Sequence, residues 1–283
     1  QKKKYLPDIA SGKKLAAFGL TEADAGSDAG SIRTTATRTE GGYILNGTKQ
    51  WITNGGEAET YTIIAMTDRS RGPRGASALI LEKGMPGFTF GKKENKMGIR
   101  ASATRELVFQ DCFVPKANLI AKEGMGFIVT MRTFDRTRPG VGAQGVGLAQ
   151  GALDEAVRYA REREQFGKKI ISFQAVQHML ADMATQVEAA RALVYSVSRY
   201  IDQSENPKEI SKVSGMAKVF ASDTAMKVTT DAVQIFGGYG YMKEYPVEKM
   251  MRDAKILQIY EGTNQIQRNV IGLELSKEYA GKK

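Results

Sequence analysis

The stretch SFQAVQHMLADMATQVEAARALVYSVSRYI, residues 172–201, decides the fold of the second half of this chain, because its apolar residues recur at three- and four-residue steps. That recurrence is the period of one face of an α-helix. Two further helices are predicted, over about 125–162 and over 210–238, where the segment ends at glycines. Long helices with such stripes pack as a bundle with short connections. The apolar stripe of residues 172–201 consists of Val176, Met179, Leu180, Met183, Val187, Ala190, Leu193, Val194 and Val197.

The first half of the chain has a different period. Between Leu15 and about Leu119, short segments rich in β-branched and aromatic residues alternate with Gly, Pro, Asn and Asp, which is typical of strands and turns. Their spacing suits an antiparallel barrel or sandwich. The expected fold class is therefore α+β, with a central antiparallel β-barrel or sandwich domain over residues 1–121 and a C-terminal helical bundle over residues 122–283. The predicted strands cover residues 43–55, 60–67, 76–83, 87–93 and 104–115.

Composition excludes several classes of protein. With 283 residues and 42% hydrophobic content, the chain can bury a core and form about two domains. The single cysteine, Cys112, excludes a disulfide framework, and the single histidine, His178, leaves no His/Cys cluster for zinc, so no metal site is expected. No run of ~20 apolar residues is present, and the first ten residues lack the apolar core of a signal peptide. We expect a soluble, intracellular protein without a membrane partner.

The formal net charge of +10 is compatible with a nucleic acid or a phosphorylated cofactor as partner. The lysines and arginines are scattered among acids, without an arginine-rich block or zinc-finger spacing. This distribution argues against nucleic acid and favours the phosphorylated cofactor.

Residues 140–145, GVGAQG, match the dinucleotide fingerprint G-x-G-x-x-G. The fingerprint requires a buried strand before it, whereas the preceding MRTFDRTRP is too charged for such a strand. We therefore interpret these glycines as a small-residue helix face that permits close packing.

Three other segments offer groups that a flat, phosphorylated cofactor requires. Residues 18–28, FGLTEADAGSD, place hydroxyls and backbone N–H groups in a compact turn, although a hairpin with capping hydroxyls would explain this segment by itself. Residues 51–56, WITNGG, contain the only tryptophan, and residues 161–170, REREQFGKKI, supply an arginine, a glutamine and an aromatic ring. Together they provide stacking surfaces, hydrogen-bond donors and cations.

One acid, Glu261, stands in QIYEGTNQIQ, residues 258–267, just before a predicted helix start at Thr263 and Asn264. By itself this pattern fits a helix-terminal surface acid as well as a catalytic base.

In order along nearly the whole chain, these motifs resemble the acyl-CoA dehydrogenase family, and within it the short- and medium-chain, butyryl-type enzymes. The family has an N-terminal helical domain, a central β domain and a C-terminal four-helix domain. Residues 1–12 resemble the end of the first domain, whose remainder normally forms a wall of the acyl pocket. Either the chain is a fragment or a partner supplies that wall. The motifs are LTEADAGSD, NGTKQWITNGG, MGIRASATRELVFQDCFVP, YAREREQFGKKI, DAVQIFGGYGY, YPVEKMMRDAKI and IYEGTNQIQ.

The resemblance implies FAD-dependent α,β-dehydrogenation of a short- to medium-chain acyl-CoA to a trans-2-enoyl-CoA. Glu261 matches the base that abstracts the α-proton, and N5 of FAD takes the β-hydride. In some relatives the base lies on the helix that corresponds to residues 131–140 of this chain, but these ten residues contain no Glu. The alternatives are an acyl-CoA oxidase of the same fold, or a relative that binds CoA esters or DNA without turnover.

The resemblance also implies the remaining contacts. The family is usually a homotetramer in which two chains share each flavin, it passes electrons to electron-transferring flavoprotein, and it occurs in the bacterial cytoplasm, which we favour, or the mitochondrial matrix. The substrate contacts are Ser27, Asp135, Arg138, Tyr260 and Gly262. The FAD contacts are Phe18, Leu20, Thr21, Gly26, Ser27, Trp51, Thr53, Thr263 and Gln265, with Arg163, Gln165, Phe166, Gln174, Gln234, Gly237 and Gly238 on the adenosine diphosphate of a neighbouring subunit's FAD.

Overall fold

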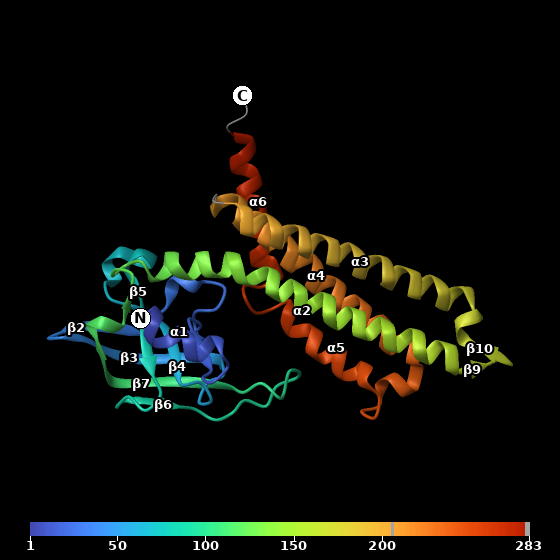
Figure 1. Ribbon diagram of the computed structural model, residues 1–283, viewed down its shortest axis with the longest axis horizontal. Helices are drawn as coiled ribbons and strands as arrows, with labels where there is room; N and C mark the ends of the chain where they lie inside the picture. Colours follow the sequence, from blue (N-terminus) through green and yellow to red (C-terminus); the bar gives the residue numbers. More distant parts are fainter. Residues whose placement is uncertain (205–206, 281–283) are drawn as a thin grey trace. The chain divides into compact units, whose positions relative to one another are not determined.

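The computed structural model describes residues 1–204 and 207–280 (Figure 1). The chain divides into two compact units, each described here by itself. The first, called the β unit, comprises residues 1–96 and 100–131, and the second, called the helical unit, comprises residues 97–99 and the chain from Arg132 onward. A sheet followed by long helices confirms the predicted α+β class. The predicted boundary between residues 121 and 122 stays a prediction.

Within the described ranges, the β unit contains one eight-stranded sheet in the order β6-β7-β3-β2-β4-β5-β8, with β1 paired to β4. The five predicted strands are present, and β1, β2 and β8 lie outside the predicted ranges. The helix α1 (Lys2–Ala10) precedes the sheet. The strands are β1 (Ala16–Gly19), β2 (Thr35–Thr39), β3 (Gly42–Thr53), β4 (Thr60–Met66), β5 (Ala76–Glu82), β6 (Phe88–Phe90), β7 (Thr104–Pro115) and β8 (Leu119–Ile120).

The sheet is mixed, which corrects the expectation of a purely antiparallel domain. Strand β1 runs parallel to β4 over four residue pairs, and β2 pairs with β4 in parallel at Thr35 and Met66. Parallel neighbours require a long connection, and the chain between β1 and β4 provides one. Strand β4 is buried along most of its length, as expected for a strand that both β1 and β5 flank. The turn that follows β1 therefore starts from a strand that is paired to the buried β4.

The helical unit is formed by long helices that lie side by side over much of their length (Figure 1). Helix α4 packs against α3, α5 and α6, and one apolar core includes side chains from α2, α3, α4 and α5. The three helices predicted from periodicity are confirmed to within a few residues at each end. The helices are α2 (Gly126–Glu162), α3 (Gln174–Gln203), α4 (Pro207–Phe236), α5 (Pro246–Leu257) and α6 (Asn264–Ala280), with a short hairpin of β9 (Glu164–Gln165) and β10 (Lys168–Lys169).

The glycines of residues 140–145 lie inside α2, so the structure confirms close helix packing there. A Cβ atom on Gly142 would approach Val194 Cγ2 to 2.9 Å, and a Cβ atom on Gly145 would approach the Ala221 carbonyl oxygen to 2.8 Å. The absence of these side chains brings α2 close to α3 and α4.

We predict opposite effects for the same substitution at two glycines of α2. Gly145→Ala should lower the free energy of unfolding by about 1–3 kcal/mol, because the methyl group would meet the backbone of α4. Gly147→Ala should raise it by up to ~1 kcal/mol, because nothing lies within 4 Å and alanine favours a helix. Urea unfolding of both variants measures the difference, and equal stabilities would contradict the packing role of Gly145.

Candidate active site

The loop between α5 and α6 contains Glu261 in an unusual backbone conformation. Glu261 has φ of 56° and Gly262 has φ of 89°, both in the left-handed region. This region costs a residue with a side chain roughly 1–2 kcal/mol. The backbone N–H of Asn264 donates to the Gln258 carbonyl at 3.0 Å and closes the loop. Other contacts must therefore stabilise the conformation of Glu261.

The Glu261 carboxylate is half-buried and is oriented by α2. The Thr137 hydroxyl, on α2, donates to Oε2 of Glu261 at 2.6 Å. Since this contact spans more than a hundred residues of sequence, only the packing of α2 against the α5–α6 loop can produce it. The side chain of Glu261 thus has a defined direction.

The backbone of the loop is held by two more side chains. Arg138 Nε donates to the Glu261 carbonyl oxygen at 3.2 Å, and Gln267 Nε2 donates to the same oxygen at 3.0 Å. Arg138 is buried and pairs with Asp135 at 2.9 Å. Burial lowers the pKa of the Arg138 guanidinium and raises the pKa of the Asp135 carboxyl, while each group's charge opposes the shift of the other. The predicted substrate contacts Asp135 and Arg138 thus adjoin the loop of the predicted base.

The neighbours of Glu261 in sequence are also fixed. The Tyr260 hydroxyl donates to Gln144 of α2, and burial raises the pKa of Tyr260 to about 12. Gly262 has φ of 89°, which favours glycine, and a Cβ atom there would also lie 2.4 Å from Gln267 Nε2. The Thr263 hydroxyl accepts from the Ile266 N–H at 3.2 Å, which confirms the predicted helix start. The side chain of Gln265 is exposed.

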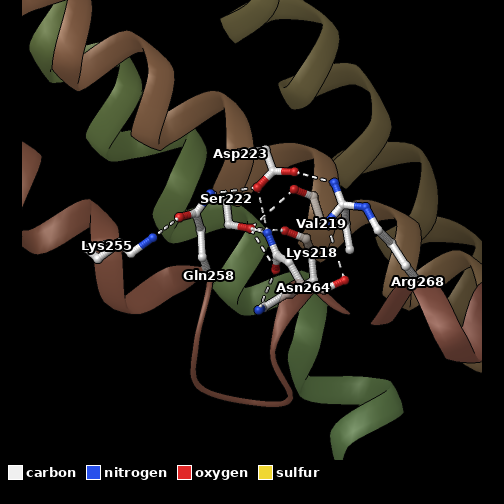
Figure 2. A network of polar contacts seen from close by, with 8 residues as sticks. All are labelled: Lys218, Val219, Ser222, Asp223, Lys255, Gln258, Asn264 and Arg268. Carbon is white, nitrogen blue, oxygen red and sulfur yellow. Dashed lines mark hydrogen bonds and ion pairs between the residues drawn. The ribbon is translucent and has the colours of Figure 1, made fainter. Parts of the chain in front are cut away.

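Lys218 of α4 lies beneath the loop and was missed by the sequence interpretation (Figure 2). Its ammonium donates to the Gly262 carbonyl at 2.9 Å and to Asn264 Oδ1 at 2.8 Å. Burial, followed by repulsion from Arg138, lowers the pKa of Lys218 to about 8. The signal in the sequence was a lysine on the buried stripe of α4, between Ala217 and Ala221.

A second group of predicted residues meets around a cavity of about 540 Å³ at the far end of α4. Arg163 and Gln165 line it together with Gly237 and Gly238. The Arg163 guanidinium lies over the ring of Tyr239, 5.4 Å from its centroid. The cavity therefore combines a cation, a glutamine amide, aromatic rings and exposed backbone.

A tight hairpin positions this cavity's polar residues. Phe166 and Gly167 connect β9 to β10 with φ of 53° and 75°, the pattern that two-residue hairpins require. The ring of Phe166 is 92% exposed. The predicted contacts Phe166, Gln174 and Gln234 are all exposed and lie outside the residues that line the cavity.

In the β unit, a buried ion pair supports the turn over residues 20–28. Lys49 Nζ, which is inaccessible to solvent, contacts Glu22 Oε1 at 2.6 Å and donates to the Leu20 carbonyl at 3.0 Å. Glu22 also accepts from the N–H groups of Arg33 and Thr34. Burial lowers the pKa of Lys49 to about 8, although Glu22 opposes the shift. The sequence interpretation missed Lys49, a lysine between two strand-like apolar runs.

The Lys49–Glu22 pair anchors the turn that contains the predicted cofactor contacts. Leu20 is buried, and the Thr21 carbonyl accepts from the Gln50 N–H at 2.8 Å, whereas the side of the turn with Gly26 and Ser27 is exposed. The register shift between β3 and β7 at Lys49–Ile52 coincides with a φ of 56° at Trp51, whose ring is 58% exposed. Thr53 is exposed and Phe18 is partly buried.

These residues fit FAD by the chemistry of their side chains. The cavity at the end of α4 has a cation and glycines that admit a phosphate close to the backbone, and the β unit presents an exposed indole and hydroxyls. Among residues 1–204 and 207–280, no group of three His, Cys, Asp or Glu side chains could hold a metal ion. Over the same part of the chain, no helix has the length and apolar character needed to cross a membrane.

Two family models cover most of the chain. Residues 17–112 match the model described as acyl-CoA dehydrogenase, middle domain, and residues 124–275 match the model described as acyl-CoA dehydrogenase, C-terminal domain. An acyl-CoA dehydrogenase of Bacillus subtilis (strain 168) is 54% identical over 271 residues, which are 96% of this chain and 71% of that protein.

Solved structures agree with the family models. Butyryl-CoA dehydrogenase from Megasphaera elsdenii has a TM-score of 0.94 at 53% identity, over 97% of this chain and 71% of its own. A chain in the structure of the electron transferring flavoprotein of Acidaminococcus fermentans has a TM-score of 0.94 at 58% identity, with the same two coverages.

We predict strong energetic coupling within the buried pair of the β unit. Lys49→Met should lower the free energy of unfolding by about 3 kcal/mol, because it leaves the Glu22 carboxylate buried without its cation. Adding Glu22→Gln should recover about 2 kcal/mol, because the remaining charge is then removed. Urea unfolding at pH 7 of both single variants and the double variant measures the coupling.

The exposed pair Arg33–Asp24 is the control for this cycle. Variants Arg33→Met and Asp24→Asn should show no measurable coupling, because solvent screens exposed ion pairs. Independent effects of Lys49→Met and Glu22→Gln would contradict the role of the buried pair.

Proposed function

This chain belongs to the acyl-CoA dehydrogenase family of flavoprotein oxidoreductases, and from that premise we propose that it removes one hydrogen each from Cα and Cβ of a short- to medium-chain acyl-CoA. The product is the trans-2-enoyl-CoA. The name of the butyryl-CoA dehydrogenase to which the chain is similar supports a short acyl chain. The main support for the proposal is the carboxylate of Glu261, which Thr137 orients on a loop that Arg138 and Gln267 hold by hydrogen bonds.

Glu261 abstracts the α-proton in this proposal. The α-hydrogen of a thioester is a very weak acid, so the site must stabilise the negative charge that develops on the thioester oxygen. In the family the backbone N–H of the base donates to that oxygen. The contacts of Arg138 and Gln267 to the Glu261 carbonyl hold the peptide that follows Glu261, and Thr137 orients the carboxylate. One residue thus supplies the base while its backbone supplies a donor.

FAD, when bound, supplies the acceptor for the β-hydrogen as hydride. We assign its ring, ribityl chain and pyrophosphate to Phe18, Leu20, Thr21, Gly26, Ser27, Trp51 and Thr53, with Thr263 and Gln265. The cavity beside Arg163 would hold the adenosine diphosphate of a neighbouring subunit's FAD, through Arg163, Gln165, Gly237 and Gly238, with Phe166, Gln174 and Gln234 at its edge. This assignment makes the active protein a homo-oligomer, which we propose is a tetramer.

The substrate lies against Tyr260 and Gly262 in this proposal, with Ser27, Asp135 and Arg138 as further CoA contacts. Asp135 and Arg138 form a buried pair, so their contribution depends on the pair being intact. We propose electron-transferring flavoprotein as electron acceptor, which the similarity to a chain of the Acidaminococcus fermentans structure supports. We place the reaction in the bacterial cytoplasm, because the relatives named above are bacterial.

Glu261→Gln should leave the fold and the bound FAD unchanged and lower the rate of butyryl-CoA oxidation by about 10³-fold, because the amide cannot take the α-proton. Anaerobic bleaching of the flavin absorbance by butyryl-CoA measures this rate directly. Glu188→Gln, at an exposed position of α3, serves as control and should react like the parent. A rate within tenfold of the parent would show that another group takes the proton.

Arg163→Ala should raise the dissociation constant for FAD by about tenfold or more, because a charge-assisted hydrogen bond to a phosphate is lost. Fluorescence titration of the flavin-depleted protein with FAD measures the constant. Arg161→Ala, two residues earlier at an exposed position, removes the same charge outside the cavity and should bind FAD like the parent. Equal affinities of the two variants would contradict the assignment of the cavity.

A further inference from the structure

Lys218 places an ammonium group in the interior of the helical unit, where both of its hydrogen-bond acceptors are neutral. Its side chain has no solvent exposure, and its two acceptors are the Gly262 carbonyl at 2.9 Å and Asn264 Oδ1 at 2.8 Å. Arg138 raises the cost of the charge, whereas Asp223 and Glu261 reduce it. Burying an ammonium costs free energy unless the group is paired and hydrogen-bonded, so the hydrogen bonds of Lys218 offset part of that cost.

The two acceptors of Lys218 flank the start of α6. Gly262 follows Glu261 in the left-handed turn, and Asn264 is the first residue of the helix. One ammonium therefore ties the end of the loop to the beginning of the next helix. The Gly262 carbonyl belongs to the peptide between Gly262 and Thr263, so this hydrogen bond restrains the left-handed turn one peptide after Glu261.

Both ends of the loop converge on the same turn of α4 (Figure 2). Asp223 Oδ1 accepts from Gln258 Nε2 and from Asn264 Nδ2, each at 2.7 Å. Asp223 Oδ2 contacts Arg268 Nη2 at 2.6 Å, and Ser222 accepts from Asn264 Nδ2 at 2.9 Å. Among the side chains drawn in Figure 2, Lys218 is the one that bonds to the loop backbone next to Glu261. Gln267 Nε2 donates to the same Gly262 carbonyl at the longer distance of 3.3 Å.

We propose that Lys218 is a positioning residue for the catalytic base, acting through the Gly262 carbonyl and Asn264 to hold the turn that presents Glu261. Only the expected effect of Lys218 on catalysis rests on the proposed function. The mechanical part, that Lys218 restrains the loop, stands on the contacts alone.

The test compares hydrogen–deuterium exchange of the peptide over residues 258–264 in the purified protein and in Lys218→Met. The variant should exchange roughly tenfold faster there, because the loop loses its ammonium donor, while peptides of the β unit stay unchanged. Lys227→Met is the control, since it removes an exposed ammonium from the same helix, paired with Asp231. Lys218→Gln, whose amide can still donate, should show an intermediate rate and serves if the methionine variant does not fold.

Kinetics with butyryl-CoA supply the second measurement. Lys218→Met should lower kcat by about tenfold with KM within threefold of the parent, because the base is misplaced while the substrate contacts remain. Parent-like exchange in every Lys218 variant that folds would overturn the proposal, as would faster exchange with unchanged kcat. A parent without dehydrogenase activity would overturn the proposed function instead, and the exchange rates would still report on Lys218.

Discussion

The left-handed turn at Glu261 and Gly262 is the constraint on which the site depends. A residue with a side chain stays in that conformation only when its surroundings over-determine it. The surroundings come from α2, which supplies Thr137 and Arg138, and from α4 and α6, which supply Lys218 and Gln267. These short contacts require α2 and α4 to lie close together, and the glycines at 142 and 145 provide that approach about one and two turns further along α2. The small-residue face that resembled a nucleotide fingerprint thus helps to support the turn at Glu261.

Two buried lysines illustrate two ways to hold a turn. Lys49 in the β unit has a carboxylate partner, Glu22, whose remaining lone pairs accept backbone N–H groups, so the pair acts as a bridge between segments of the turn. Lys218 has neutral acceptors and depends on more distant acids for compensation. Removing the partner of Lys49 leaves a buried charge without its counter-ion. Removing Lys218 leaves no unpaired charge, and the Gly262 carbonyl and Asn264 Oδ1 keep Gln267 Nε2 and the Ser222 hydroxyl as donors. The first lysine is thus more important for stability, and the second for local geometry.

The hydrophobic periodicity of the sequence and the order of its motifs predicted much of the fold. The α+β class, the long helices and five strands followed from alternation and from helical stripes, because burial of one face imposes those periods. The parallel pairings of β1 and β2 with β4 were not predictable, because strand order depends on contacts distant in sequence. For the same reason the sequence did not predict the contacts of Lys49 and Lys218, because their partners lie on other elements of the fold. The motif identified Glu261, but its contact with Thr137 required the fold.

Helix α4 contacts the Glu261 loop through Lys218, in its first half, and lines the cavity with residues at its C-terminal end. From Lys218 to Gly237 there are 19 residues, or about 28 Å at 1.5 Å per residue, which is roughly the diameter of a small domain. An adenosine diphosphate bound at the cavity would thus lie far along the helix from the Glu261 loop of the same chain. The length of a single helix therefore supports the assignment of the cavity to a neighbouring subunit's flavin. On this reasoning an isolated chain would hold two half-sites, and association of chains would complete each one.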